Sequence, residues 1–392
     1  MWKTINQLTN TKSKTTNINE LIINQEIVTE PEKIADSLNT YFNETGTVLA
    51  KDLPKGNNSF ETYVVPTDKS FEINRFSSIN VKNVISKINT SKATGHDRIS
   101  PKLLKDSADI IAESLTVIFN KSIETCIFPD DLKVACISPI YKGESKTECS
   151  NYRPISVISV VAKVFEKLVS GQLMEYLETY QLLSECQAGF RKRSSTVTSL
   201  LTNTNQWYIN MDKGLLNGII FLDLKKAFDC VDHAILIEKL KKFGCVGNTL
   251  NWFKSYFTNR KQMCKVNQTT SKCRTVSCGV PQGYKLGPIL FLLYVNDLSN
   301  CLKSTTASMF ADDTSTPTEL YNKLNNDLEN IHQWLLANKL TLNTSKTEYM
   351  IVGSRQRLGK IDDEAELWNS HINTVATKVS KGIGMIRRMK AF

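Results

Sequence analysis

The chain has 392 residues, of which 41% are hydrophobic and 22% charged, so it is long enough for two or three domains with a sizeable core. Lys and Arg outnumber Asp and Glu by 49 to 39, and this net charge of +10 fits nucleic-acid binding as well as an ordinary basic protein. The chain has only four histidines and no CxxC pair, which argues against a zinc site of the usual spacing. The ten cysteines are expected to be reduced thiols. No signal peptide or membrane span is predicted, so we expect an intracellular protein of the cytoplasm or nucleus that is not secreted.

The first half of the chain is predicted to be mostly helical. Residues 1–29 are rich in Asn, Thr and Lys and predict a loosely ordered arm, which is followed by a helix over 31–42 that begins at Pro31. A loop over 51–62 is the expected boundary between arm and body. Apolar spacing then predicts three helices and one strand, the helices over 81–88, 101–126 and 157–173 and the strand over 135–142.

The second half alternates between strands and helices. GIIFLDL (218–224) is a short apolar run that begins at a glycine, which predicts a buried strand. The later elements are expected to be a helix over 231–244, a hairpin of 261–266 with 273–278, a helix over 287–298, a strand–turn–strand around 309–313, a helix over 318–339 and a strand over 347–353. This order predicts an α+β fold in which helices cover an antiparallel sheet.

Acidic residues end two of the predicted strands. Asp223 ends the first, and Asp312 and Asp313 lie at the turn of ASMFADDTS. Taken alone, the acidic pair favours ordinary turn chemistry by about two to one. If the strands are neighbours, however, bare carboxylates about 4 Å apart repel by roughly 4 kcal/mol, and divalent cations reverse that sign. Their position in a basic protein therefore favours metal-dependent phosphoryl chemistry.

Two further features have both a structural and a functional interpretation. Phe228, five residues after Asp223, fits core packing at least as well as a role in the site. The loop GVPQG (279–283) either lets the backbone approach a ligand closely or only turns the chain.

These segments resemble the motifs of reverse transcriptases, most closely those of non-LTR retrotransposons of the LINE/jockey type. The likeness runs from about residue 75 to 355, and a seventh segment, 334–354, resembles the part that follows the acidic pair. Six motifs occur in the expected order, namely KATGHDRISPKLLK (92–105), NYRPISVISVVAKVFEKLV (151–169), QAGFRKRSST (187–196), FLDLKKAFDCVDH (221–233), GVPQGYKLGPILFLLYVND (279–297) and MFADD (309–313).

The resemblance implies a right-hand polymerase with fingers, a ferredoxin-like palm and a truncated thumb. The expected division is an N-terminal arm or linker over 1–62, fingers and a helical N-terminal part over 63–217, the palm over 218–355 and a shortened thumb or connection over 356–392. The implied function is RNA-directed DNA polymerisation, in which dNTPs are added to a primer 3′-hydroxyl on an RNA template. The implied partners are the RNA template, a DNA primer, the RNA–DNA hybrid and dNTPs, and the oligomeric state is left open.

The resemblance also assigns roles to individual residues. Asp223, Asp312 and Asp313, together with Leu224, match the positions that hold two Mg²⁺ ions, with Mn²⁺ as an alternative. Phe228 matches the bulky residue that excludes a ribose 2′-hydroxyl.

Five more residues match positions that contact substrate. Gln282 and Gly283 match the loop that touches the incoming nucleotide and template, and Arg153 and Lys142 match fingers residues that hold the triphosphate. A planar guanidinium suits that task. Lys346 matches a lysine proposed to protonate the departing pyrophosphate, although an exposed loop lysine is an equally good interpretation.

Three departures from the family pattern keep other functions open. Tyr284 and Lys285 stand where a small residue usually follows Gln-Gly, a β-rich stretch usual after the palm is missing beyond residue 363, and no endonuclease-like region precedes the arm. One alternative is therefore a decayed copy that only binds nucleic acid. A weaker alternative is a metal-dependent nuclease that uses the same carboxylates.

Overall fold

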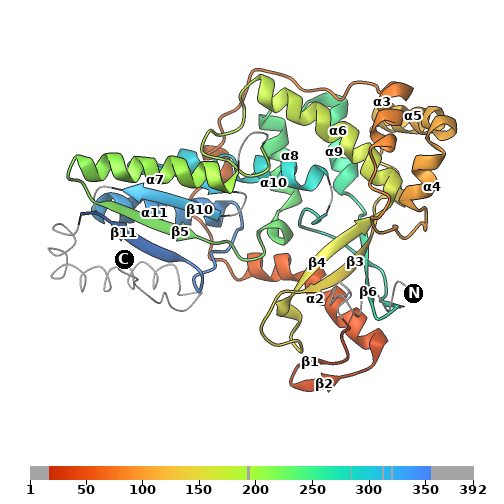
Figure 1. The fold of residues 1–392 in the computed structure, drawn as a ribbon, viewed down its shortest axis with the longest axis horizontal. Helices are drawn as coiled ribbons and strands as arrows, with labels where there is room; N and C mark the ends of the chain where they lie inside the picture. The colour runs from red at the N-terminus through yellow and green to blue at the C-terminus, as the bar shows by residue number, and fades with distance from the viewer. Residues whose placement is uncertain (1–16, 192–194, 284, 311–312, 319–320, 355–392) are drawn as a thin grey trace, which may run out of the picture.

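The computed structural model describes residues 17–191, 195–283, 285–310, 313–318 and 321–354. Within these ranges the fold is a mixture of helices and strands, with a four-stranded and a five-stranded sheet on different sides of a helical body and a separate two-stranded sheet (Figure 1). The predicted thumb over 356–392 lies outside the described residues, and the division into domains stays a prediction. None of the helices in the described ranges is both long and apolar enough to cross a membrane.

The first sheet has four antiparallel strands in the order β11-β5-β10-β9. Its strands are β5 (Asn217–Leu222), β9 (Ser308–Phe310), β10 (Asp313–Thr318) and β11 (Glu348–Val352). The strand–turn–strand and the flanking strands were all predicted, and the antiparallel arrangement confirms that part of the sequence prediction. The helix α11 (Tyr321–Ala337) contacts β10, and α7 (Thr196–Asp212) contacts β5 and β9.

The second sheet is mixed, because β3 pairs antiparallel with β4 and parallel with β6. Its strands are β3 (Val134–Tyr141), β4 (Tyr152–Ile158), β6 (Lys261–Val266), β7 (Thr269–Thr270) and β8 (Arg274–Thr275). The predicted hairpin is the pairing of β6 with β8. The helix predicted over 157–173 begins too early, since Val157 and Ile158 belong to β4 and α6 (Val160–Thr179) starts after the N-cap residue Ser159.

The helical body contains the predicted helices, one of them divided in two, and also α9, which the sequence analysis did not predict. It is formed by α3 (Ser78–Ser86), α4 (Pro101–Asp106), α5 (Ala108–Thr125), α6, α8 (His233–Lys242), α9 (Gly247–Phe257) and α10 (Leu286–Val295). The prediction of one helix over 101–126 is wrong, because the chain breaks at Ser107 into α4 and α5. The Ser107 hydroxyl donates to the Leu103 carbonyl oxygen at 2.8 Å, a local bond that competes with helical pairing.

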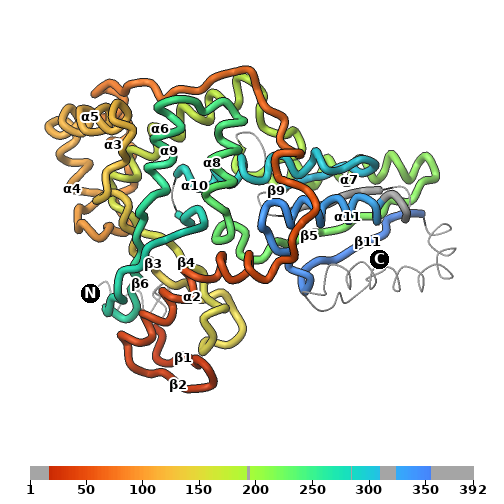
Figure 2. Tube along the Cα trace, turned by 180° about the vertical axis from the view of Figure 1, so that it is seen from behind, coloured from red at the N-terminus to blue at the C-terminus, as the bar shows by residue number. Residues whose placement is uncertain are grey.

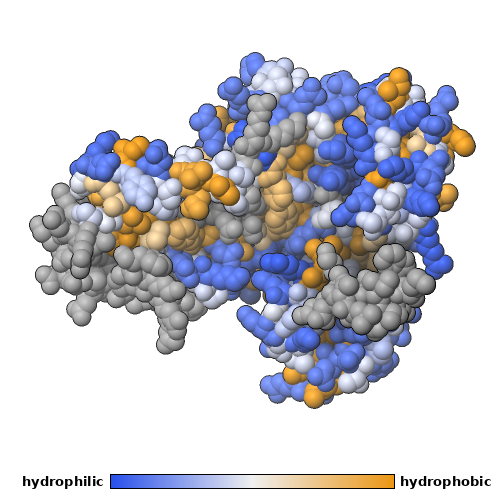
Figure 3. All heavy atoms as spheres, viewed as in Figure 1, coloured by the Kyte–Doolittle hydropathy of each residue, from blue (hydrophilic) through white to orange (hydrophobic). Residues whose placement is uncertain are grey.

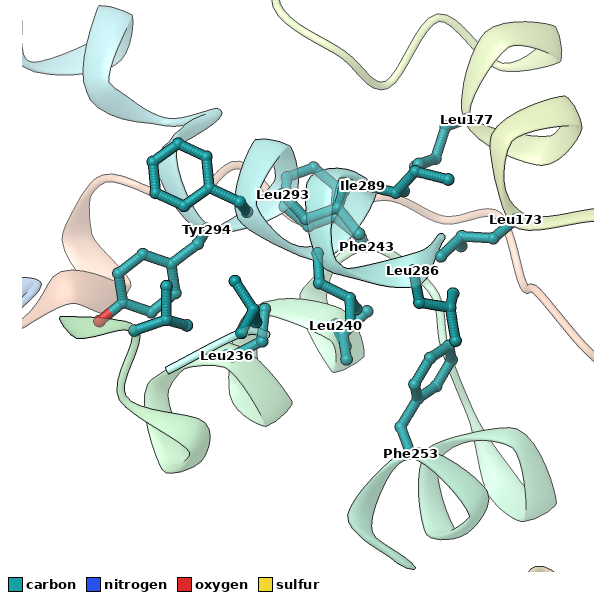
Figure 4. Close-up of a cluster of buried hydrophobic side chains, with 14 of the residues drawn as sticks. Leu173, Leu177, Leu236, Leu240, Phe243, Phe253, Leu286, Ile289, Leu293 and Tyr294 are labelled. Carbon is teal, nitrogen blue, oxygen red and sulfur yellow. The ribbon is translucent and has the colours of Figure 1, made fainter. Parts of the chain in front are cut away.

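The helix α10 lies at the centre of the helical body. Nearly every residue of its sequence LGPILFLLYV is buried, as expected for a helix that is apolar around its whole circumference. Side chains from α6, α8 and α9 surround it, among them Leu173, Leu240 and Phe253 (Figure 4). This packing fixes the start of α10, which follows the loop 279–283 closely in the chain.

A buried ion pair lies where the helices α8, α10 and α11 meet. The Lys239 ammonium on α8 donates to Asp297 Oδ1 at 2.7 Å and to the Tyr294 carbonyl oxygen at 2.6 Å. The rings of Tyr294 and of Trp334 on α11 lie 5.0 and 5.4 Å from the ammonium. Burial lowers the pKa of Lys239 and raises that of Asp297, whereas the attraction between the two groups favours their charged forms. The pair therefore depends on both partners being present.

The N-terminal segment packs against the second sheet. It forms a hairpin of β1 (Leu21–Ile23) with β2 (Glu26–Val28), and then α2 (Pro31–Lys51), which Figure 2 shows next to β3, β4 and β6. The helix begins at Pro31 as predicted but continues nine residues beyond the predicted end at residue 42. Its Ile34, Leu38 and Phe42 belong to the same buried cluster as Ala135 and Ile137 of β3.

The helix α7 was not predicted from the sequence. It has a capping box at Ser195 but buries none of its residues fully, and its apolar spacing is interrupted by Thr and Asn. Val197, Leu201 and Tyr208 are 62–66% exposed, and Figure 3 shows apolar side chains along this helix. The periodic apolar signal is weak because α7 covers the sheet through partly buried side chains.

Candidate active site

Asp223 lies directly after β5, with a half-buried side chain. The amide Nδ2 of Asn343 donates to its Oδ2, and the Asn343 N–H donates to the Asp223 carbonyl oxygen at 2.7 Å. The Lys225 N–H donates to Thr341 O at 2.8 Å, so residues 341–343 run alongside 223–225. Asn343 therefore orients the carboxylate. Sequence reasoning missed it, because an Asn before a turn carries no particular functional signal.

The strand register brings the second acidic motif to Asp223. Thr314 of β10 lies opposite Leu222, and Ser315 lies opposite Phe221. Asp313 and Asp223 each stand next to the last pair of this ladder, Thr314 with Leu222, so their backbones lie at the same end of the sheet. Asp312 and the side chain of Asp313 lie outside the described residues. Among the residues that are described, no group of three His, Cys, Asp or Glu side chains could hold a metal ion.

Four cationic side chains gather near this end of the sheet. Lys142 follows β3 and Arg153 lies on β4, and the pKa of Lys142 is lowered first by burial and then by the positive charges of Lys346, Arg153 and Lys226. Lys346 reaches this place because its N–H bonds the Asn343 carbonyl oxygen, next to Asp223. The structure thus brings together three residues that the sequence had assigned to phosphate, and their mutual repulsion favours an anion among them.

Lys226 is a member of this cluster that sequence reasoning missed. Its ammonium donates to the carbonyl oxygens of Ser150 and Tyr152 at 3.2 and 3.4 Å, which joins the segment after β5 to β4. Burial lowers the pKa of Lys226, while the negative charge of Asp229 opposes that shift. Two adjacent lysines in the motif gave no indication of which one would turn inward.

Phe228 packs against the helical body and is also bonded to the loop 279–283, so the structure fits both a core role and a role in the site. It lies on the 3₁₀ helix η4 (Ala227–Cys230), and its half-buried ring stacks on Phe291 of α10 with centroids 4.2 Å apart. The ring of Phe190 meets it edge to face at 6.2 Å. The Phe228 carbonyl oxygen accepts the N–H of Val280 at 2.8 Å, which joins η4 to the loop 279–283.

The loop 279–283 lies against β4 and depends on Gly283. The Ser156 N–H donates to the Gln282 carbonyl oxygen at 2.9 Å, and Gly283 has a φ of +103°. A Cβ at Gly283 would lie 2.9 Å from Ser156 O. Another residue there would be both strained and obstructed. Gln282 Nε2 lies 3.4 Å from Asp229 Oδ1, so the amide faces this half-buried carboxylate.

The half-buried Asp229 and the fully buried Glu166 are carboxylates that the sequence analysis did not single out. Burial raises the pKa of Asp229 to about 6, although Lys226 and Gln282 oppose the shift. Together with Gln282, Asp229 lines a cavity of about 40 Å³ beneath the loop. Asp229 therefore interacts both with Lys226 of the cation cluster and with Gln282 of the loop.

Glu166 of α6 anchors the far end of the same loop. Its Oε2 accepts the N–H groups of Lys285 and Leu286 at 3.0 and 3.5 Å, and its Oε1 accepts the Tyr256 hydroxyl at 2.8 Å. Burial raises the pKa of Glu166, and these donors favour its charged form. A carboxylate at the first turn of α10 also suits the helix dipole. Tyr284, which departs from the family pattern, lies outside the described residues.

Comparison with known proteins identifies relatives of this chain. The family described as "Reverse transcriptase (RNA-dependent DNA polymerase)" matches residues 140–377. A probable RNA-directed DNA polymerase from transposon X-element of Drosophila melanogaster is 32% identical over 252 residues, which is 62% of this chain and 27% of that protein. The RNA-directed DNA polymerase from mobile element jockey of Drosophila melanogaster is 28% identical over 262 residues, 65% of this chain and 28% of that protein. The chain thus spans less than a third of the length of these relatives.

Proposed function

Because the chain belongs to the reverse transcriptase family, with similarity to members from non-LTR retrotransposons, we propose that it is an RNA-directed DNA polymerase that extends a DNA primer on an RNA template. The observation that carries this proposal is the register of β10 with β5, which brings the backbones of Asp313 and Asp223 to the same end of the sheet, near the four cations. In this proposal the four-stranded sheet belongs to the palm, the second sheet to the fingers, and 356–392 to a shortened thumb.

Reverse transcriptases generally use divalent metal ions. We assign two Mg²⁺ ions, with Mn²⁺ as a substitute, to the carboxylates of Asp223, Asp312 and Asp313 and to the carbonyl oxygen of Leu224. These hard oxygen donors suit Mg²⁺. The bonds to residues 341–343 come from Asp223 and Lys225 on either side of Leu224, and no backbone bond within the described residues takes up the Leu224 carbonyl oxygen. When bound, the ions would activate the primer 3′-hydroxyl and stabilise the charge of the leaving pyrophosphate.

The remaining side chains bind and orient the substrates. Arg153, Lys142 and Lys226 would bind the triphosphate, and the guanidinium of Arg153 offers paired donors to phosphate oxygens. Lys346 would give a proton to the pyrophosphate as it leaves. Gln282 and Gly283 would contact the incoming nucleotide and the template. The reaction forms a bond between the 3′-oxygen and the α-phosphorus and breaks the bond to pyrophosphate, so positioning supplies most of the catalysis.

Primer extension by the purified chain tests the proposal. With primed RNA, Mg²⁺ and dNTPs we expect products that lengthen with time and disappear when EDTA removes the metal. Salt-dependent RNA binding without extension would favour the decayed alternative and contradict the proposal. Cleavage of the RNA without dNTPs would favour the nuclease alternative and contradict it as well.

Replacing Phe228 by Ala is expected to lower the preference for dNTPs over rNTPs by about 10–100-fold, because the ring no longer occupies the space of a 2′-hydroxyl. Single-nucleotide incorporation with matched dNTP and rNTP measures this ratio. Phe190→Ala serves as the control, since it removes a neighbour of the ring but leaves the ring in place. An unchanged ratio of dNTP to rNTP incorporation in Phe228→Ala would contradict the proposed exclusion of the 2′-hydroxyl and leave Phe228 with a packing role alone.

A further inference from the structure

The helix α2 contacts the segment that carries Phe228 at a glycine. A Cβ built on Gly46, which is buried in the middle of α2, would lie 2.2 Å from the Asp229 carbonyl oxygen and 2.7 Å from Cys278 Sγ. A glycine within a helix costs about 1 kcal/mol relative to alanine. Here it permits the backbones of α2 and η4 to lie in direct contact. Alanine at this position would force the two elements apart.

A second contact reaches the other end of η4. The ring of Tyr41, one and a half turns before Gly46, lies 5.7 Å from the Lys226 ammonium. Lys226 is the residue before η4 and has a left-handed backbone with φ +47°. The helix α2 therefore contacts Lys226, just before η4, and Asp229, the third residue of η4. These contacts lie on both sides of Phe228, and the first involves the cation cluster.

A third contact joins α2 to the loop 279–283. Phe42 and Asn43 line the same cavity as Asp229, Gly279 and Gln282. The N–H groups of Gly279 and Val280 donate to the carbonyl oxygens of Val231 and Phe228 at 2.8 Å each. The helix, η4 and the loop thus form one packed unit, and Figures 1 and 2 both show α2 passing next to the second sheet.

We propose that α2 is a positioning element of the nucleotide site, and that Gly46 sets the distance between α2 and η4. This inference rests on the function proposed above for the site. The atom nearest to a new Cβ is the backbone carbonyl oxygen of Asp229, and the next is Cys278 Sγ. Because a carbonyl oxygen cannot move without its backbone, the clash is relieved mainly by displacing η4. Displacing η4 would move the Phe228 ring and Lys226 together. A misplacement of about 1 Å at a reacting centre can cost about 100-fold in rate.

The test compares Gly46→Ala with Gly171→Ala in the full chain. Gly171 is the matched control, because it lies in the helix α6 and a Cβ there meets no atom within 4 Å. For Gly46→Ala we expect the KM for dNTP to rise about tenfold or more, while the affinity for primed RNA changes less than about twofold. Gly171→Ala should change neither. A merely structural role would reduce the folded fraction and leave the KM unaltered.

Hydrogen exchange gives a readout that does not require activity. The N–H groups of Asp229, Gly279 and Val280 are hydrogen-bonded within this unit. They should exchange faster in Gly46→Ala than in the parent and in Gly171→Ala. Unchanged exchange at these amides overturns the inference, and so does faster exchange with an unchanged KM. If the parent chain itself gives no extension, the proposed function fails, and exchange at these amides alone decides whether α2 positions η4.

Discussion

Replacing Asp223 by Asn is expected to lower the rate of primer extension by about 1,000-fold or more, with the protein still folded. The amide has the shape of the carboxylate but carries no charge, so it cannot offset the positive charge of the ions assigned to this site. A loss of that size equals about 4 kcal/mol of transition-state stabilisation, which is reasonable for a group that holds a metal ion. Single-turnover extension at saturating Mg²⁺ and dNTP measures the rate.

Two further variants make this prediction specific. Asn343→Ala removes the amide that orients the Asp223 carboxylate but leaves the carboxylate in place, so we expect an intermediate loss of about tenfold. Asp109→Asn, at an exposed ion pair with Lys82 on the helical body, should leave extension unchanged. Extension by Asp223→Asn within tenfold of the parent would contradict the role assigned to Asp223. Thermal unfolding and RNA binding confirm that each variant is folded.

Replacing Asp297 by Ala is expected to destabilise the protein by about 3–5 kcal/mol, because it leaves the buried Lys239 ammonium without its counter-charge. The Lys239 and Asp297 side chains are 0% and 2% exposed, so water cannot take the place of the lost carboxylate. Among the remaining contacts, the Tyr294 carbonyl oxygen and two aromatic rings compensate only part of the charge. Urea unfolding followed by tryptophan fluorescence measures the loss and includes the signal of Trp334.

A surface pair and a double variant are the controls for Asp297. The pair of Asp68 with Lys69 has a similar separation of 3.0 Å but is largely exposed, so Asp68→Ala should leave the free energy of unfolding nearly unchanged. The double variant Lys239→Met with Asp297→Leu removes both charges and should recover most of the stability lost in Asp297→Ala. A cost below about 1 kcal/mol for Asp297→Ala would mean that the ammonium finds another partner or releases its proton.

The elements that the sequence predicted well are those whose burial is visible locally. The apolar run of β5, the continuous apolar stretch of α10 and the Pro31 start of α2 each carry their own signal. The end of β4 carries no such signal, because the residues of VISVV (157–161) suit a strand and a helix equally. Where the strand ends is decided by its pairing with β3. The parallel pairing of β3 with β6 is also invisible locally, because it joins segments more than a hundred residues apart.

The candidate site shows the same division between local and distant information. Asp223, Arg153 and Phe228 could be proposed because each lies within a motif that resembles the family. Asn343 and Glu166 could not, since each acts on a partner 119 or 120 positions away in the sequence. A buried glutamate within an apolar helix looks like any partly exposed helix residue until the fold shows what it contacts.

The bonds of Glu166 have a mechanical consequence for the loop before α10. The carboxylate accepts the N–H groups of Lys285 and Leu286, and α10 is buried on nearly all sides, so this end of the loop is held in place. The opposite end is held as well, because the N–H groups of Gly279 and Val280 donate to the carbonyl oxygens of Val231 and Phe228 at 2.8 Å each. The Gln282 carbonyl oxygen accepts the Ser156 N–H between these two anchors, so the backbone of Gln282 keeps a set height above β4 without help from a bound ligand.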